Sequence, residues 1–136
     1  MRILIRILLF FVTVVLFSCE DTGHFVKCSE CTTTEPVKAE LEIKVDINNS
    51  GAATLIDVYE GNLEDGVLYD SFSTTDPTSS ISVTMNKKYT VTARYNLTGD
   101  IYIAVDSATP RVKYTKDQCE NPCYFVYDKV LDLRLK

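Results

Sequence analysis

The chain has 136 residues, of which 14 are Lys or Arg and 19 are Asp or Glu, so its formal net charge is −5. An acidic chain repels phosphate backbones and anionic headgroups, and no basic patch interleaved with aromatic residues occurs, so we do not expect nucleic-acid binding. The length is enough for one domain with a real core and too short for two.

The first residues are typical of a secretory signal. Arg2 and Arg6 form a short basic region, and residues 7–17 are apolar except for Thr13. This apolar run is shorter than the roughly 20 residues that a helix needs to cross a bilayer, and small and polar residues follow it instead of a basic stop-transfer flank. We therefore expect residues 1–18 to be a signal peptide that is removed on export.

Residues 16–19 read Leu-Phe-Ser-Cys. This tetrapeptide resembles the lipobox of bacterial lipoproteins, in which the cysteine thiol is diacylated and the signal is cleaved just before it. The resemblance implies that Cys19 is the first residue of the mature chain and its site of lipidation. Two or more acyl chains hold a protein stably on a membrane without a spanning segment.

The residues after Cys19 predict a flexible connection. Residues 19–37 are polar, contain a threonine run and a proline, and show neither helical nor strand periodicity, so we expect a lipidated tether. Glu20 and Asp21 resemble the acidic export tag of Bacteroidota-type lipoproteins, which implies the outer membrane and favours its cell-surface side over its periplasmic side. Without Arg2 and Arg6 the mature formal charge becomes −7.

From residue 38 onward, short apolar runs with a period of two alternate with turn residues. Such runs cover residues 38–47, 55–60, 67–72, 81–85, 89–95, 101–105, 112–114, 124–127 and 130–135. The pattern predicts half-buried strands, and no stretch has the apolar spacing of an amphipathic helix. We predict that residues 38–136 form a single all-β domain, an antiparallel β-sandwich of about seven to nine strands.

The alternation also predicts which residues pack in the core. In the hairpin formed by residues 89–95 and 101–105, we expect the odd-numbered side chains of both strands to face the interior. Three tyrosines, Tyr102, Tyr124 and Tyr127, are candidates for an exposed binding surface, although tyrosine is equally common as a half-buried strand residue.

Four cysteines besides Cys19 fall into two close pairs, Cys28 with Cys31 and Cys119 with Cys123. An even count in an exported chain indicates disulfides, and four cysteines allow three connectivities. We favour bridges from the N-terminal pair to the C-terminal pair. Closing a loop of roughly 90 residues would stabilise the fold by about 4 to 5 kcal/mol in the chain-entropy model.

Two alternative interpretations of these cysteines remain. Their spacing is close to that of a structural zinc site, although an oxidising compartment argues against free thiolates. A thiol oxidoreductase would need one cysteine of the first pair at a helix N-terminus, in a segment that shows no helical periodicity. We therefore assign no metal ligands and no cofactor.

No catalytic constellation is evident. His24 is the only histidine and lies in the predicted tether, so we expect it to be solvated. The acids of residues 61–66 match no calcium-binding spacing, and Gly, Asn and Asp are ordinary turn residues. We assign no catalytic residues and expect a protein that is not an enzyme.

Several segments together resemble small surface lipoproteins of Bacteroidota. They are the lipobox, the acidic tag, residues 56–66 (Ile-Asp-Val-Tyr-Glu-Gly up to a second Gly), residues 88–95 (Lys-Tyr-Thr-Val-Thr-Ala-Arg-Tyr) and the end of the chain from Cys119. The hairpin is similar to immunoglobulin-like and carboxypeptidase-regulatory-like (transthyretin-like) sandwiches. The resemblance implies a location and a fold, and it carries over no functional residues.

These observations favour a membrane-anchored, exported lipoprotein that acts as a binding module for a surface protein or glycan. The binding surface would be formed by loops or by an exposed edge strand. A structural subunit of a surface appendage is the alternative, and a zinc-thiolate or thiol-redox protein is a weaker one.

Overall fold

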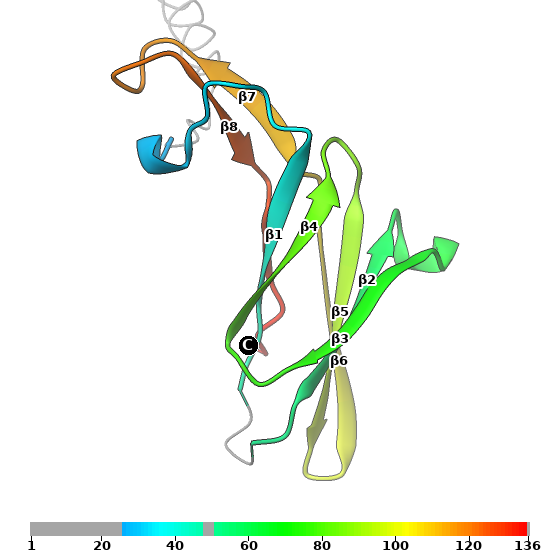
Figure 1. Ribbon diagram of the computed structural model, residues 1–136. Coiled ribbons are helices and arrows are strands. Elements are labelled where there is room, and N and C mark those ends of the chain that lie inside the picture. The colour runs from blue at the N-terminus through cyan, green and yellow to red at the C-terminus, as the bar shows by residue number, and fades with distance from the viewer. Residues whose placement is uncertain (1–25, 48–50, 136) are drawn as a thin grey trace, which may run out of the picture.

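The computed structural model describes residues 26–47 and 51–135 (Figure 1). Within these residues the chain forms nine strands and two single 3-10 turns, η1 (Cys28–Glu30) and η2 (Leu63–Asp65). The strands are β1 (Lys38–Lys44), β2 (Thr54–Glu60), β3 (Leu68–Thr74), β4 (Thr78–Thr84), β5 (Tyr89–Leu97), β6 (Asp100–Ala108), β7 (Arg111–Thr115), β8 (Cys123–Tyr127) and β9 (Val130–Asp132). Each predicted apolar run corresponds to one strand.

Two sheets pack face to face and enclose the core. One has the strand order β4-β1-β9 and the other has the order β3-β2-β5-β6. The predicted all-β, sandwich-like class is confirmed.

Two features of the topology were not predicted. Strand β9 pairs with β1 in parallel, whereas the sequence pattern predicted only antiparallel neighbours. Strands β7 and β8 form a separate two-stranded sheet at one end of the molecule (Figure 1). Strand β1 starts at this end of the molecule, and the chain also passes from β8 at this end into β9. Strands β1 and β9 therefore run in the same direction.

The core follows from the period-two pattern of the strands. The inner faces of both sheets supply side chains that are almost completely buried, and their alternate neighbours point outward. The buried cluster consists of Ala39, Leu41, Ile43, Val45, Ile56, Val58, Val83, Met85, Tyr89, Val91, Ala93, Tyr95, Ala108, Leu131 and Leu133.

The hydroxyl groups of two tyrosines in this cluster form hydrogen bonds with the backbone. The Tyr95 hydroxyl donates to the Leu133 carbonyl oxygen at 2.8 Å and accepts from the Asp46 amide at 3.2 Å. The Tyr89 hydroxyl accepts from the Thr84 amide at 3.1 Å. Burial raises the pKa of the Tyr95 hydroxyl.

The β5–β6 hairpin differs from the prediction in which side of β6 faces the core. Its two-residue turn pairs Leu97 with Asp100, so odd-numbered residues of β5 lie opposite even-numbered residues of β6. Opposite residues in a sheet share one face. The odd residues of β5 are therefore buried as expected, whereas Ile101, Ile103 and Val105 point outward, and the prediction that they face the core is wrong.

The turn itself contains an unusual residue. Thr98 has a φ of 52° and Gly99 a φ of 92°, and two positive values are typical of the tight turns that match the twist of a hairpin. Glycine adopts this conformation freely, but a β-branched side chain does so at a cost.

We therefore predict that Thr98→Asn stabilises the protein by about 0.5 to 1 kcal/mol, because asparagine tolerates the left-handed conformation far better. Urea unfolding followed by far-UV circular dichroism measures the change. Thr75→Asn, at another exposed loop threonine without a positive φ, serves as the control and is expected to have little effect. An unchanged midpoint for Thr98→Asn would show that the turn is not strained.

Candidate functional site

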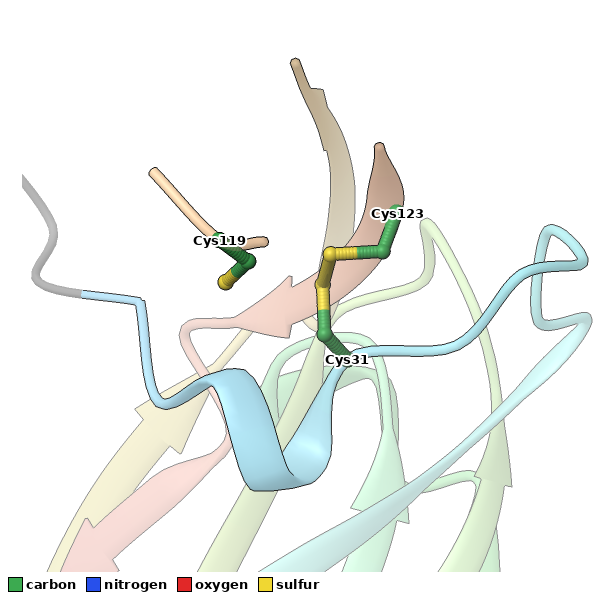
Figure 2. Close-up of side chains that lie close together, drawn as sticks. All are labelled: Cys31, Cys119 and Cys123. Carbon is green, nitrogen blue, oxygen red and sulfur yellow. A yellow bond between two sulfur atoms is a disulfide. The ribbon is translucent and has the colours of Figure 1, made fainter. Parts of the chain in front are cut away.

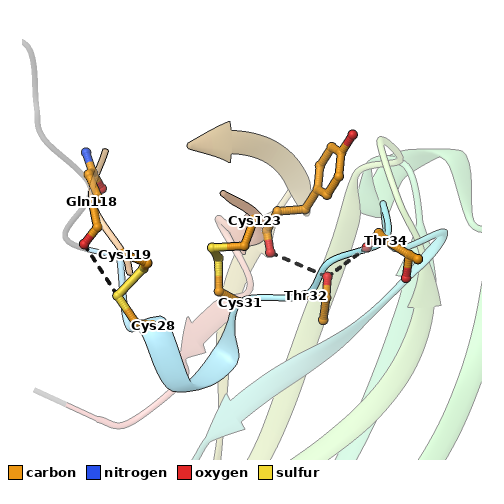
Figure 3. Close-up of a disulfide and its surroundings, with 8 residues drawn as sticks. Cys28, Cys31, Thr32, Thr34, Gln118, Cys119 and Cys123 are labelled. Carbon is orange, nitrogen blue, oxygen red and sulfur yellow. Dashed lines mark hydrogen bonds between the residues drawn. A yellow bond between two sulfur atoms is a disulfide. The ribbon is translucent and has the colours of Figure 1, made fainter. Parts of the chain in front are cut away.

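The four cysteines beyond Cys19 form two disulfides, and both connect the N-terminal pair to the C-terminal pair. Cys28 is bonded to Cys119 and Cys31 to Cys123, with a Cα–Cα distance of 5.6 Å in each bridge (Figure 3 shows both bridges, and Figure 2 shows the second). From the sequence we favoured bridges between the two pairs, which the structure confirms, and left open which cysteine joins which. We call these two bridges and the residues that they join the disulfide clamp.

The clamp fixes part of the segment that was predicted to be a tether. Thr32 and Tyr124 donate their backbone amides to each other's carbonyl oxygens, at 2.9 and 2.8 Å (Figure 3 shows Thr32 beside β8). The Lys129 ammonium group lies 2.6 Å from a Glu30 carboxylate oxygen, and this hydrogen bond and charge lower the pKa of Glu30. Residues 28–32 are therefore held against β8 and belong structurally to the domain.

The clamp also bears on the zinc alternative. The Sγ atoms of Cys31, Cys119 and Cys123 all lie within 4.8 Å of one another (Figure 2). In the structure every clamp sulfur is bonded to another sulfur, and zinc binds thiolates. A metal site here would first require that both disulfides be reduced.

The remaining predicted residues are placed as follows. Cys19 and His24 lie outside the described residues. Within the described part of the chain, no helix has the length and apolar character required to cross a bilayer. Asp65 accepts a hydrogen bond from the Asn62 amide at 3.1 Å and so caps the single turn η2 instead of forming an open ligand loop.

The three candidate tyrosines do not form one surface. Tyr102 is exposed on β6, whereas Tyr124 and Tyr127 lie on β8 and are half-buried. The Tyr124 ring packs on Tyr114, with ring centroids 4.9 Å apart.

Three surface hollows contain basic side chains, and they differ in whether these side chains already have a partner within the protein. One, of about 320 Å³, lies beside the clamp, and its Lys27 and Lys129 are both paired with Glu30. Another, of about 340 Å³, contains Lys88, whose ammonium group donates to the Asn62 side chain at 2.7 Å. In both hollows these cations are already occupied by partners within the protein.

The third hollow, of about 210 Å³, lies on the outer face of the β3-β2-β5-β6 sheet near the β5–β6 turn. Its walls include Leu55 from β2, Arg94 and Asn96 from β5, and Ile101 from β6. The register places these four side chains on the same face, because Leu55 lies opposite Arg94 and Asn96 lies opposite Ile101.

An apolar stripe runs from this hollow along β6. Ile101, Ile103 and Val105 are 65%, 57% and 52% exposed, although isoleucine and valine are among the residues most often buried. We define Leu55, Arg94, Ile101, Ile103 and Val105 as the outer patch. A contiguous apolar surface rimmed by polar groups is typical of an interaction site.

Arg94 is the charged group of the outer patch. It lies between Leu55 on β2 and Ile103 on β6, is exposed, and has no hydrogen bond or ion pair with any described residue. An arginine among apolar side chains is a frequent composition of binding hot spots.

Sequence reasoning missed the outer patch because it assigned the stripe to the core. The usable signal was the two-residue turn at Thr98 and Gly99, which reverses the odd and even faces between the two strands. In the sequence, Arg94 is one of the polar residues that alternate with the apolar residues of this strand, and nothing distinguishes it from an ordinary solvent-facing residue.

Comparisons with protein-family models, with curated proteins and with solved structures found no match to this chain.

The arrangement of the clamp predicts that the two bridges do not contribute additively to stability. The cysteines of each pair are only three or four residues apart, so the first bridge closes a loop of about 90 residues and the second closes only a short one. Replacing either bridge by two serines should cost about 2.5 kcal/mol, and replacing both should cost about 7 kcal/mol. Urea unfolding of the three variants measures this, and equal, additive losses would contradict it.

Proposed function

We propose that this protein is an exported lipoprotein, anchored to the outer membrane through Cys19, that acts as a non-enzymatic binding module at the cell surface. The basic and apolar leader, the lipobox-like residues 16–19 and the acidic residues after them support the anchor. The two disulfides fit an oxidising compartment outside the cytoplasm.

The observation that carries the binding role is the outer patch. It exposes three large aliphatic side chains and an arginine that has no acidic partner among the described residues, and these groups would be costly to display without a function. The described residues contain no histidine, and no buried side-chain polar atom among them lacks a partner. These properties favour a surface for binding over a site for chemistry.

The shape of the molecule supports the same role. The β5–β6 turn and the β7–β8 sheet lie at opposite ends of the domain (Figure 1), and the clamp joins the N-terminal segment to the β7–β8 end. Cys19 precedes Cys28 by nine residues, which span at most about 30 Å when extended. A lipid on Cys19 would therefore keep the clamp end near the membrane and leave the end with the β5–β6 turn away from it.

The alternative role, a subunit of a surface appendage, is less well supported. A strand-exchanging subunit needs a terminal strand that is free to complete a neighbour. Strand β9 is instead paired with β1 of its own domain. Leu131 within β9 and Leu133 directly after it are completely or almost completely buried.

The anchor is tested by the intact mass of the protein extracted from membranes. We expect a chain that begins at Cys19 and carries acyl groups on that residue, and we expect Cys19→Ala to abolish both the acylation and the membrane association. An unacylated chain, or cleavage at another position, would contradict the anchor.

The binding role is tested by placing a photoreactive amino acid at Ile103 in cells that display the protein. We expect one defined cross-linked product, which disappears when Ile101→Lys is introduced beside the probe. The same photoreactive residue at Lys113, an exposed position on β7, is the control and should give no such product. Identical products at both positions, or none at Ile103, would exclude the outer patch as a binding surface.

A further inference from the structure

Strand β6 is an edge strand, and its half toward the β5–β6 turn has few of the features that usually protect an edge from pairing with another chain; the charged residues of β6 are Asp100 and Asp106. It pairs with β5 over nine residues without a bulge, and it contains no lysine, arginine, proline or glycine. Natural edges are commonly blunted by these residues, by bulges or by short length. At the opposite edge of the same sheet, the pairing of β3 with β2 contains a register shift. In the other sheet, the edge strand β9 has only three residues.

The free part of this edge lies toward the turn. Near its other end, Asp106 accepts the Asp132 amide at 2.9 Å, so β9 approaches β6 there. From Asp100 to Ala104 the β6 backbone is paired on the β5 side only, within the described residues. An extended segment could add to this half of the strand by backbone hydrogen bonds.

The outer patch restricts the chemistry of such a segment. Every second side chain of an added strand would lie on the outer face, and the position beside Ile101 favours an apolar residue, whereas the position beside Ile103 lies in line with Arg94. Arg94 lies on the next strand inward, about 10 Å from an added strand at the usual strand spacing. A glutamate on the added strand and the long Arg94 side chain can meet across this distance.

A second copy of the chain fits this surface poorly. Paired β6 strands would present only Ile101, Ile103, Val105 and Ser107 on the outer face, so neither copy would supply a carboxylate to Arg94. The predicted mature charge of −7 also disfavours close association of two copies.

We propose that the free half of β6 binds an extended segment of a partner protein by strand addition, and that this segment carries a carboxylate between apolar residues. The carboxylate pairs with Arg94, and the apolar side chains cover the stripe. This inference rests on the proposed binding function and specifies the class of partner.

The experiment uses the full chain in lipid nanodiscs and three fluorescent peptides. The acidic peptide is Val-Thr-Glu-Thr-Val-Thr-Val, and the others carry Gln or Lys in place of Glu. Anisotropy titrations compare the unmodified protein with Arg94→Glu, and with Lys113→Glu as a charge-matched control on an exposed residue of β7. Ile103→Lys places a blocking charge on the edge, and circular dichroism verifies that each variant is folded.

We expect the unmodified protein to bind the acidic peptide at least tenfold more tightly than the lysine peptide. Arg94→Glu should reverse this preference, Lys113→Glu should preserve it, and Ile103→Lys should weaken binding of all three peptides. Equal affinity for the three peptides, or no effect of Arg94→Glu, would overturn the inference. A dimer in sedimentation analysis that Ile103→Lys dissociates would also overturn it, because a second copy would then be the occupant.

The two proposals can fail separately. If the cross-link at Ile103 forms but the peptides show no dependence on Arg94, the outer patch is a binding surface for a partner of different chemistry. If the cross-link does not form, the proposed binding function fails together with the inference.

Discussion

The two-residue turn at Thr98 and Gly99 fixes which side of β6 faces solvent, and the surface chemistry of the domain depends on it. Because Leu97 pairs with Asp100, every odd residue of β5 shares a face with an even residue of β6. A turn one residue longer would exchange the two faces of β6 and place Ile101, Ile103 and Val105 on the side that Tyr102 and Asp106 now occupy. This register requires Thr98 to adopt a left-handed conformation, which is energetically unfavourable for a β-branched residue.

The disulfide clamp imposes the second constraint at the opposite end of the domain (Figure 1). It holds residues 28–32 beside β8, so the chain enters β1 from the same end at which β9 begins, and the two strands run in parallel. The clamp and the β5–β6 turn thus give the domain two ends of different character. The N-terminal segment is attached at the β7–β8 end, and the outer patch begins near the β5–β6 turn at the opposite end.

Much of the fold could be predicted from the sequence, because period-two alternation is a local signal. Each of the nine strands of the described residues overlaps a predicted apolar run, and the odd-numbered residues of β5, such as Val91, face the core as expected. The parallel β1–β9 pairing, the separate β7–β8 sheet and the reversed face of β6 depend on register and long-range contacts, which alternation does not encode. That the bridges join the two pairs was predicted from the even cysteine count and the chain entropy, whereas which cysteine joins which, and the position of Arg94 between Leu55 and Ile103, depend on the three-dimensional structure.

Hydrogen exchange of the β6 amides shows whether a partner covers the free edge and the outer patch. The rates are compared between the protein in membranes isolated from the cells that produce it and the purified protein in nanodiscs, with the β7 amides as an internal reference. The account predicts at least tenfold slower exchange for residues 100–104 in the isolated membranes and unchanged rates in β7. Equal rates for residues 100–104 in the two samples would contradict it.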